Sequence, residues 1–151
     1  IRIPVARQQK KGGIFLINTR QPRKTGPLVD YFLTHTQKGG SRHIDPEKLK
    51  AVTQKTLQAF LQADNETFTD SVRELSRFQL HYMPPMIPEG YGDLWAYGLE
   101  SGDYTINLCG AGGGGFLLGF TNDLEKAEAA IDRQEKTMIP VFHYSQLESI
   151  Q

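Results

Sequence analysis

The sequence lacks the features that mark disulfide-bonded, membrane-spanning and strongly charged proteins. Cys109 is the only cysteine among 151 residues, so an internal disulfide framework is excluded and a reducing compartment, the cytoplasm, is expected. No run approaches the roughly twenty apolar residues of a membrane span, and no signal-peptide pattern opens the chain. Lys and Arg together number 17, as do Asp and Glu, so no bulk charge attracts nucleic acid or a membrane. We therefore expect a soluble, cytoplasmic protein that binds neither.

Metal-binding and nucleophilic patterns are equally scarce. The histidines, at positions 35, 43, 81 and 143, are scattered along the chain, and with one cysteine they form no metal-ligand spacing. Cys109 has no adjacent basic residue to lower its thiol pKa, so we expect a small buried hydrophobic side chain rather than a nucleophile. No catalytic and no metal-binding residue is predicted in this chain.

Glycine, by contrast, is concentrated in one place. Five of the 15 glycines fall within residues 110–115, which read Gly-Ala-Gly-Gly-Gly-Gly and lie between two short apolar stretches. An ordered glycine cluster loses much backbone entropy, and it occurs where the chain needs positive φ or lies close to a ligand. Successive backbone N–H groups without Cβ atoms form a concavity that suits phosphate oxygens. We predict an anion-binding loop. The alternative is a glycine-rich hairpin without a ligand, since two-residue turns suffice for hairpins.

Two familiar phosphate-binding motifs do not fit this loop. A P-loop ends in Gly-Lys-Ser/Thr, whereas Phe116 and Leu117 follow the glycines. The loop matches the letters of the dinucleotide-binding fingerprint Gly-x-Gly-x-x-Gly, but that fingerprint opens a helix. The apolar run 115–120 is typical of a strand. The predicted geometry is therefore strand, glycine loop, strand.

A second candidate anion site precedes a predicted helix. Arg20, Arg23 and Lys24 come directly before a helix that we predict to begin with Thr25 as its N-cap and Pro27 in its first turn. The unpaired N–H groups of a helix N-terminus and nearby guanidinium groups can converge on one anion. An exposed basic loop is the alternative, because surface charges often make no specific contact.

The remaining helices are predicted from caps and apolar periodicity. Asp45 caps a helix with an apolar stripe, and Asp64 or Asn65 caps a second one. A short helix at 93–100 closes at Gly102, and a capping box from 122 to 125 opens a last helix that runs through residue 134. The predicted stripes are Leu49, Val52, Leu57, Phe60 and Leu61 in the first of these helices, and Phe68, Val72, Leu75 and Phe78 in the second.

The order of strands and helices predicts the fold. Strands are expected at 13–19, 104–109, 115–120 and 138–142. The resulting order is the split β-α-β-β-α-β pattern of an α+β, ferredoxin-like fold, with extra helices in the first crossover. We expect one antiparallel four-stranded sheet with helices on one face.

Two stretches together resemble a known family, the GHMP small-molecule kinases. Residues 108–116, Leu-Cys-Gly-Ala-Gly-Gly-Gly-Gly-Phe, resemble the third, C-terminal motif of that family. Residues 18–29, Asn-Thr-Arg-Gln-Pro-Arg-Lys-Thr-Gly-Pro-Leu-Val, are similar to the segment after the linker strand in mevalonate kinases, whose pattern runs roughly Asn-Thr-Lys-x-Pro-Arg-x-Thr-x-x-Leu-Val. The resemblance implies the same ferredoxin-like fold, the type of the GHMP kinase C-terminal domain, and ATP-dependent phosphoryl transfer to a hydroxyl group, with mevalonate kinases the closest group.

The resemblance also implies which residues form the site. By carry-over, the backbone of the loop lines the cleft near the transferred phosphate and the acceptor, and Arg23 and Thr25 lie on the substrate side. A sugar or sugar-phosphate kinase, of the galactose or heptose-phosphate type, and a non-catalytic ferredoxin-like ligand-binding module remain as alternatives. The loop residues assigned to the site are Gly110, Ala111, Gly112, Gly113 and Gly114.

The departures from the family pattern are as informative as the matches. The chain has no Pro-x-x-x-Gly-Leu-x-Ser-Ser loop, and it lacks the lysine and the acidic residue of the family's N-terminal half. We therefore expect residues 1–12 to be a remnant of a linker, and residues 13–151 to be a C-terminal domain whose partner is an N-terminal kinase domain. That domain would hold most of the ATP and Mg²⁺. The segment alone is expected to be inactive, and uncovered apolar surface could favour a homodimer. Phe116, where mevalonate kinases often have a smaller residue, leaves the acceptor open.

Overall fold

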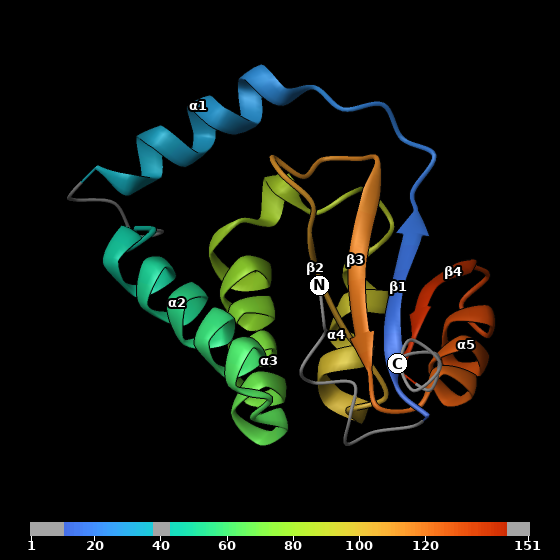
Figure 1. Ribbon diagram of the computed structural model, residues 1–151. Helices are drawn as coiled ribbons and strands as arrows, with labels where there is room; N and C mark the ends of the chain where they lie inside the picture. Colours follow the sequence, from blue (N-terminus) through green and yellow to red (C-terminus); the bar gives the residue numbers. More distant parts are fainter. Residues whose placement is uncertain (1–10, 38–42, 145–151) are drawn as a thin grey trace.

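The computed structural model describes residues 11–37 and 43–144, and Figure 1 shows their arrangement. Within this part of the chain four strands form one antiparallel sheet in the order β2-β3-β1-β4. The predicted linker 1–12 lies almost wholly outside the described residues. The strands are β1 (Gly13–Asn18), β2 (Thr105–Leu108), β3 (Phe116–Thr121) and β4 (Met138–His143).

The helices occupy the two crossovers, as the split pattern predicts. The second crossover holds α5 (Leu124–Asp132) alone, and the other helices all lie between β1 and β2. The prediction of a ferredoxin-like sheet with extra helices in the first crossover is therefore confirmed. The first crossover contains α1 (Thr25–Thr36), α2 (Pro46–Gln62), α3 (Asn65–Tyr82), the 3-10 helix η2 (Pro84–Met86) and α4 (Gly92–Ser101). Among the described helices, none has both the length and the apolar character that crossing a membrane requires.

The main core lies between one face of the sheet and helices α4 and α5; in Figure 1 α4 lies behind the strands and α5 lies beside β4. Phe15 and Ile17 of β1 are completely buried there beside Trp95 of α4. A buried relay joins three elements, because Trp95 Nε1 donates to Ser76 Oγ of α3 at 2.7 Å, and Ser76 Oγ donates to the carbonyl of Ile106 in β2 at 2.7 Å. The relay holds α3 along the edge strand β2.

The opposite face of the sheet is also covered at one end, so the prediction of helices on one face only is wrong there. Side chains alternate between the two faces of a strand, and Ile14, next to Phe15, packs in a second cluster with Phe68 of α3. The rings of Phe68 and Phe120 meet edge to face, with centroids 5.4 Å apart. Since α3 follows the edge strand, its first turn reaches around to this face.

Three predicted helix caps are confirmed, and the last helix differs from its prediction at both ends. Asp45, Asp64 and Gly102 cap α2, α3 and α4 as predicted. The predicted capping box at 122–125 is displaced, because Asp123 is the N-cap and its carboxylate accepts from the N–H of Lys126 at 3.1 Å. The last helix ends at residue 132, not 134. Helix boundaries set by local hydrogen bonds shift easily by one or two residues.

The predicted apolar stripe of α2 is only partly correct. Val52 and Ala59 are buried against α3, whereas Leu57 and Leu61 are 56% and 64% exposed. Helix α2 is the outermost element on its side of the molecule (Figure 1) and has a single neighbouring helix layer to pack against. One narrow face is therefore buried: Phe60 packs on the Phe68 ring, whereas Leu57 and Leu61 are left outside.

Candidate functional site

The glycine loop connects β2 to β3, as the predicted strand, loop, strand geometry requires. Gly110, Gly112, Gly113 and Gly115 all have φ between +71° and +74°. In this left-handed region an L-residue with a Cβ is strained by roughly 1–2 kcal/mol. The sequence therefore carries glycine at these positions because the backbone path demands it.

Four hydrogen bonds tie the loop to the rest of the chain. The N–H of Gly113 donates to the carbonyl of Met86 at 2.6 Å, and the N–H of Gly115 donates to the carbonyl of Gln21 at 3.0 Å. The carbonyl of Gly115 in turn accepts from both the N–H and the hydroxyl of Thr19, at 2.8 and 2.9 Å. These contacts fix the loop between η2 and the segment that leaves β1.

Three other N–H groups of the loop are left without a protein acceptor. Within the described part of the chain, the N–H groups of Gly110, Ala111 and Gly114 donate to no other group, whereas residues 110 and 111 form a tight turn that engages the N–H of Gly112. Backbone N–H groups left without acceptors in a glycine loop are the arrangement that binds anions. The predicted loop residues are thus brought together, with the exception that Gly112 and Gly113 use their N–H groups internally.

Close packing accounts for some of the glycines without any ligand. A Cβ on Gly112 would collide with the carbonyl of Met86, and one on Gly114 would lie 2.6 Å from the carbonyl of Gln21. Gly110 is different, because it is exposed and a Cβ there would meet only Arg23 Nη1, at 3.6 Å. Close packing therefore explains the glycines in the middle of the loop, whereas at Gly110 only the positive φ calls for glycine and the space beside it stays open.

The three cations of the segment after β1 do not converge. Arg23 lies against the glycine loop, where its guanidinium would contact a Cβ on Gly115. Arg20, whose φ is +56°, turns instead to a separate cavity of about 320 Å³ that it shares with Tyr91 and Lys136. Lys24 is the N-cap of α1 and makes no side-chain cap hydrogen bond. The predicted cluster is therefore reduced to Arg23 at the loop.

Thr25 is not the N-cap that the sequence predicts. It is the first residue of α1, so its hydroxyl lies inside the helical turn rather than before it. With Pro27 two positions later, the first turn of α1 has no side-chain cap. Thr25 is exposed at the end of α1 that follows Arg23. The two predicted substrate-side residues are thus neighbours at the same helix start.

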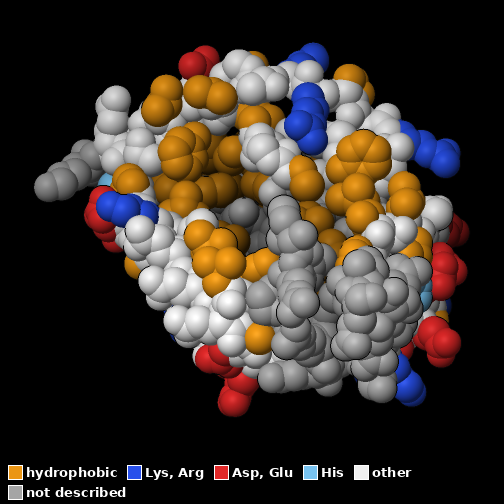
Figure 2. Space-filling model, viewed as in Figure 1, with side chains coloured by type: hydrophobic (Ala, Val, Ile, Leu, Met, Phe, Trp, Pro, Cys, Tyr) orange, Lys and Arg blue, Asp and Glu red, His pale blue; other side chains and the backbone are white. Residues whose placement is uncertain are grey.

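An apolar cavity of about 350 Å³ opens beside the loop, under α1. In Figure 2 hydrophobic side chains surround this hollow on the side of the molecule that carries α1 and α2. Gln79 contributes the one polar side chain of the lining, and Gly110 and Ala111 form part of the rim. The cavity could not be predicted from the sequence, because its walls come from five different elements. Its apolar lining consists of Val29, Phe32, Leu49, Met83, Met86 and Leu108.

Nucleophilic and metal chemistry find no support at this site. Burial raises the pKa of the Cys109 thiol, and the nearby Arg23 guanidinium lowers it by less. The thiol therefore stays protonated at neutral pH, although Cys109 is half-buried and not the fully buried side chain that the sequence predicts. Among residues 11–37 and 43–144, no group of three or more His, Cys, Asp or Glu side chains could hold a metal ion.

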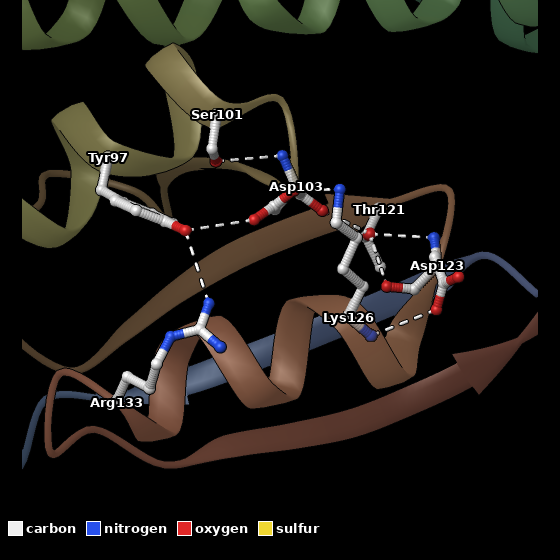
Figure 3. Close-up of polar contacts among 7 residues, drawn as sticks. All are labelled: Tyr97, Ser101, Asp103, Thr121, Asp123, Lys126 and Arg133. Carbon is white, nitrogen blue, oxygen red and sulfur yellow. Dashed lines mark hydrogen bonds and ion pairs between the residues drawn. The ribbon is translucent and has the colours of Figure 1, made fainter.

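A polar network at the opposite end of the β2–β3 hairpin was not found by sequence reasoning (Figure 3). The Asp103 carboxylate pairs with Lys126 Nζ at 2.7 Å and accepts from the Tyr97 hydroxyl at 3.3 Å. Thr121 Oγ1 donates to the Asp103 carbonyl at 2.7 Å. Because the network ties α4, β3 and α5 together far from the glycine loop, its role is structural.

The fold and the glycine loop together define a ferredoxin-like domain with a glycine-rich loop between its second and third strands, the predicted anion site. The chain belongs to the GHMP kinase family: residues 56–139 match the model of the GHMP kinases C terminal. The match includes the glycine loop and runs from α2 to β4. It leaves out β1, α1 and the segment that carries Arg23. No curated protein matches the chain.

Solved structures share the fold. A Lin0012 protein from Listeria innocua superposes with a TM-score of 0.69 and 20% identity, over 90% of this chain and 40% of its own. Phosphomevalonate kinase from Streptococcus pneumoniae, solved with phosphomevalonate and AMPPNP, superposes with a TM-score of 0.62 and 14% identity, over 82% of this chain and 36% of its own. A second structure of that kinase gives 0.62 and 13%, over 83% and 38%. The chain thus spans about two fifths of the length of these proteins, and identities this low show the fold alone.

Proposed function

We propose that the chain is the C-terminal, acceptor-binding part of an ATP-dependent kinase that phosphorylates a hydroxyl group of a small hydroxy acid, most closely of the mevalonate type. The observation that carries the proposal is the open end of the glycine loop, where N–H groups without a protein acceptor lie beside the Arg23 guanidinium. Phosphoryl transfer depends mainly on positioning and on neutralising charge. The loop N–H groups can position phosphate oxygens, and the Arg23 guanidinium can neutralise negative charge.

Each part of the site has a role in the proposal. The N–H groups of Gly110 and Ala111 bind oxygens of the transferred phosphate or of the acceptor. Arg23 binds the carboxylate of the acceptor, because a guanidinium can donate two parallel hydrogen bonds to it. Thr25, at the start of α1, presents its hydroxyl on the same side. Gly113 and Gly114 shape the loop through their contacts with Met86 and Gln21.

The proposal leaves ATP and Mg²⁺ mainly to an N-terminal kinase domain. ATP, when bound, supplies the phosphoryl group. The described residues offer no carboxylate cluster for a metal ion, so the Mg²⁺ ligands are assigned to that partner domain. The structural relatives are long enough to contain one, since the chain covers 36–40% of their length.

The test is a coupled ATPase assay on the complete protein that carries this segment, with mevalonate, phosphomevalonate, galactose and a heptose phosphate offered in turn. Arg23→Ala is compared with Lys24→Ala, an exposed cation one residue away. Loss of a charge-assisted pair should raise KM for the hydroxy acid by about tenfold or more. The Lys24 variant should leave KM unchanged.

The outcomes separate the candidate activities. Turnover with a hydroxy acid and a raised KM in Arg23→Ala support the proposal. Turnover with a sugar that is indifferent to Arg23 would retain the glycine loop as a phosphate site and discard the hydroxy-acid acceptor. No turnover with any acceptor would favour a ligand-binding module, since a fold does not determine a function.

A further inference from the structure

The cavity under α1 is lined almost entirely by hydrocarbon. Met83 and Met86 are 4% and 6% exposed and belong to a buried cluster with Phe78. The amide of Gln79 is partly committed, because its Oε1 accepts from the N–H of Leu108 at 3.1 Å. A ring of hydroxyl groups in this cavity would find few hydrogen-bond partners, and unpaired buried polar groups are costly. The lining therefore suits an aliphatic group.

The rim of the same cavity is suited to an anion. Gly110 and Ala111 line the rim, and their N–H groups donate to no acceptor within the described residues. Arg23 Nη1 lies within 3.6 Å of the position a Cβ on Gly110 would take. One molecule could thus place a charged end at the rim and an apolar body in the cavity.

The walls come from elements that hold the cavity open. Helix α1 forms one wall through Val29 and Phe32 and is held by a hydrogen bond from the Tyr31 hydroxyl to the Tyr82 carbonyl, at 3.1 Å. Leu28 of α1 packs against Gly113 on the loop. At roughly 30 Å³ for each water-sized group, a volume of about 350 Å³ holds on the order of ten such groups.

We propose that this cavity binds the hydrocarbon part of an amphiphilic anion, an aliphatic chain of roughly four to ten carbon atoms with a phosphate or carboxylate at one end. The charged end lies at the N–H groups of Gly110 and Ala111 and at Arg23. The inference rests on the proposed function in one respect, because it places the anion where the kinase acceptor would place its own. It goes further in assigning the apolar cavity beside that anion site to the hydrocarbon chain of the ligand.

The test measures the affinity of the 151-residue chain for a series of n-alkyl phosphates, from methyl to dodecyl, by titration calorimetry. Inorganic phosphate and n-hexanol are measured beside them. Burial of each methylene group should tighten binding by about threefold to fourfold. The gain should stop once the chain fills the cavity. The expected result is a plateau near eight to ten carbons, on the order of the volume given above.

Two matched variants on α1 locate the binding. Val29 lines the cavity and is 42% exposed, whereas Leu33, one turn further on, is 54% exposed and is not part of the lining. Val29→Trp should weaken hexyl phosphate at least tenfold without changing the affinity for inorganic phosphate. Leu33→Trp should change neither. If Val29→Trp does not fold, the chain-length series on the unaltered protein still tests whether the cavity binds the aliphatic chain.

The outcomes distinguish failure of this inference from failure of the proposed kinase function. Affinity independent of chain length, or equal loss in both tryptophan variants, would overturn the inference and leave the kinase proposal standing. Hexanol binding as tightly as hexyl phosphate would overturn the anionic end, and with it the anion site of the proposed function. A chain-length dependence together with no turnover in the complete protein would support the inference and reject the kinase.

Discussion

Arg23 and Gly115 are in direct contact, although 92 positions separate them in the sequence. A Cβ on Gly115 would lie 2.9 Å from Arg23 Nη2 and 3.0 Å from its Cζ. The guanidinium therefore occupies space that is available only because residue 115 is glycine. This contact places the candidate carboxylate-binding side chain on the glycine loop.

Gly115→Ala should disturb both stability and the site. Its φ of +71° disfavours alanine, so the free energy of unfolding should fall by about 1–2 kcal/mol, and Arg23 must move. Gly90→Ala is the matched control, because its φ is +73° and nothing lies within 4 Å of the added Cβ. Both variants should lose similar stability in urea denaturation, but only Gly115→Ala should raise KM for the acceptor in the complete protein. An unchanged KM would show that Arg23 is not positioned through this contact.

Ser76→Ala should be markedly more destabilising than Ser71→Ala. Both serines lie on α3 and are fully buried. Ser71 Oγ bonds within its own helix, to the Phe68 carbonyl, whereas Ser76 Oγ joins Trp95 to Ile106. Losing Ser76 leaves a buried donor and acceptor without their partner, which costs about 1–3 kcal/mol. Trp95 is the single tryptophan, so urea denaturation followed by its fluorescence measures the difference. Equal losses would show that the relay adds nothing to stability.

The Asp103–Lys126 pair should stabilise the fold across the neutral range. The hydrogen bond from Lys126 holds the pKa of Asp103 below its ordinary value of 3.8, against the opposing effect of burial. The same bond raises the pKa of Lys126 above 10.5. A lowered carboxyl pKa gives stability that is present above 3.8 and is lost as pH falls through the folded value. A raised lysine pKa gives stability that is present below 10.5 and is lost above it.

Asp103→Asn should therefore lower the melting temperature most between pH 3.8 and 10.5. The difference in melting temperature between this variant and the wild type should shrink in acid. Glu128→Gln, an exposed carboxylate on the same helix as Lys126, is the control and should have little effect at any pH. The measurement is thermal unfolding from pH 2.5 to 9. A difference that stays constant down to the lowest pH would mean that the charge of Asp103 is not what stabilises the pair.

The 151-residue chain should not catalyse phosphoryl transfer by itself. Its described residues carry no metal-binding cluster and no activated nucleophile, and the proposal assigns ATP to another domain. Incubation with ATP, Mg²⁺ and each acceptor, followed by detection of the phosphorylated product, should give no signal above the background without protein. Turnover by this chain alone would contradict the division of labour between the two domains.

Local signals were sufficient for the order of elements. Short apolar runs bounded by glycine and polar residues predicted the strands, and Asp45, Asp64 and Gly102 marked helix ends, because a cap acts on backbone groups within a few residues of itself. The same local reasoning failed by one position at Asp123 and at Thr25. At residues 122 and 123 two side chains can both accept a hydrogen bond, and only the backbone angles choose between them. At α1 the N-cap is Lys24, which has no acceptor group, so no cap pattern in the sequence marks that helix start.

The sequence by itself determined the split order of strands and helices and the glycine loop between two strands, since both depend on short-range periodicity and on the backbone freedom of glycine. Only the tertiary structure decided that Arg23, and not Arg20, reaches the loop, that Leu57 and Leu61 stay exposed, and that an apolar cavity opens under α1. These features depend on how distant segments pack, as when the Gly115 N–H finds the Gln21 carbonyl. No short stretch of the chain contains both partners of such a contact.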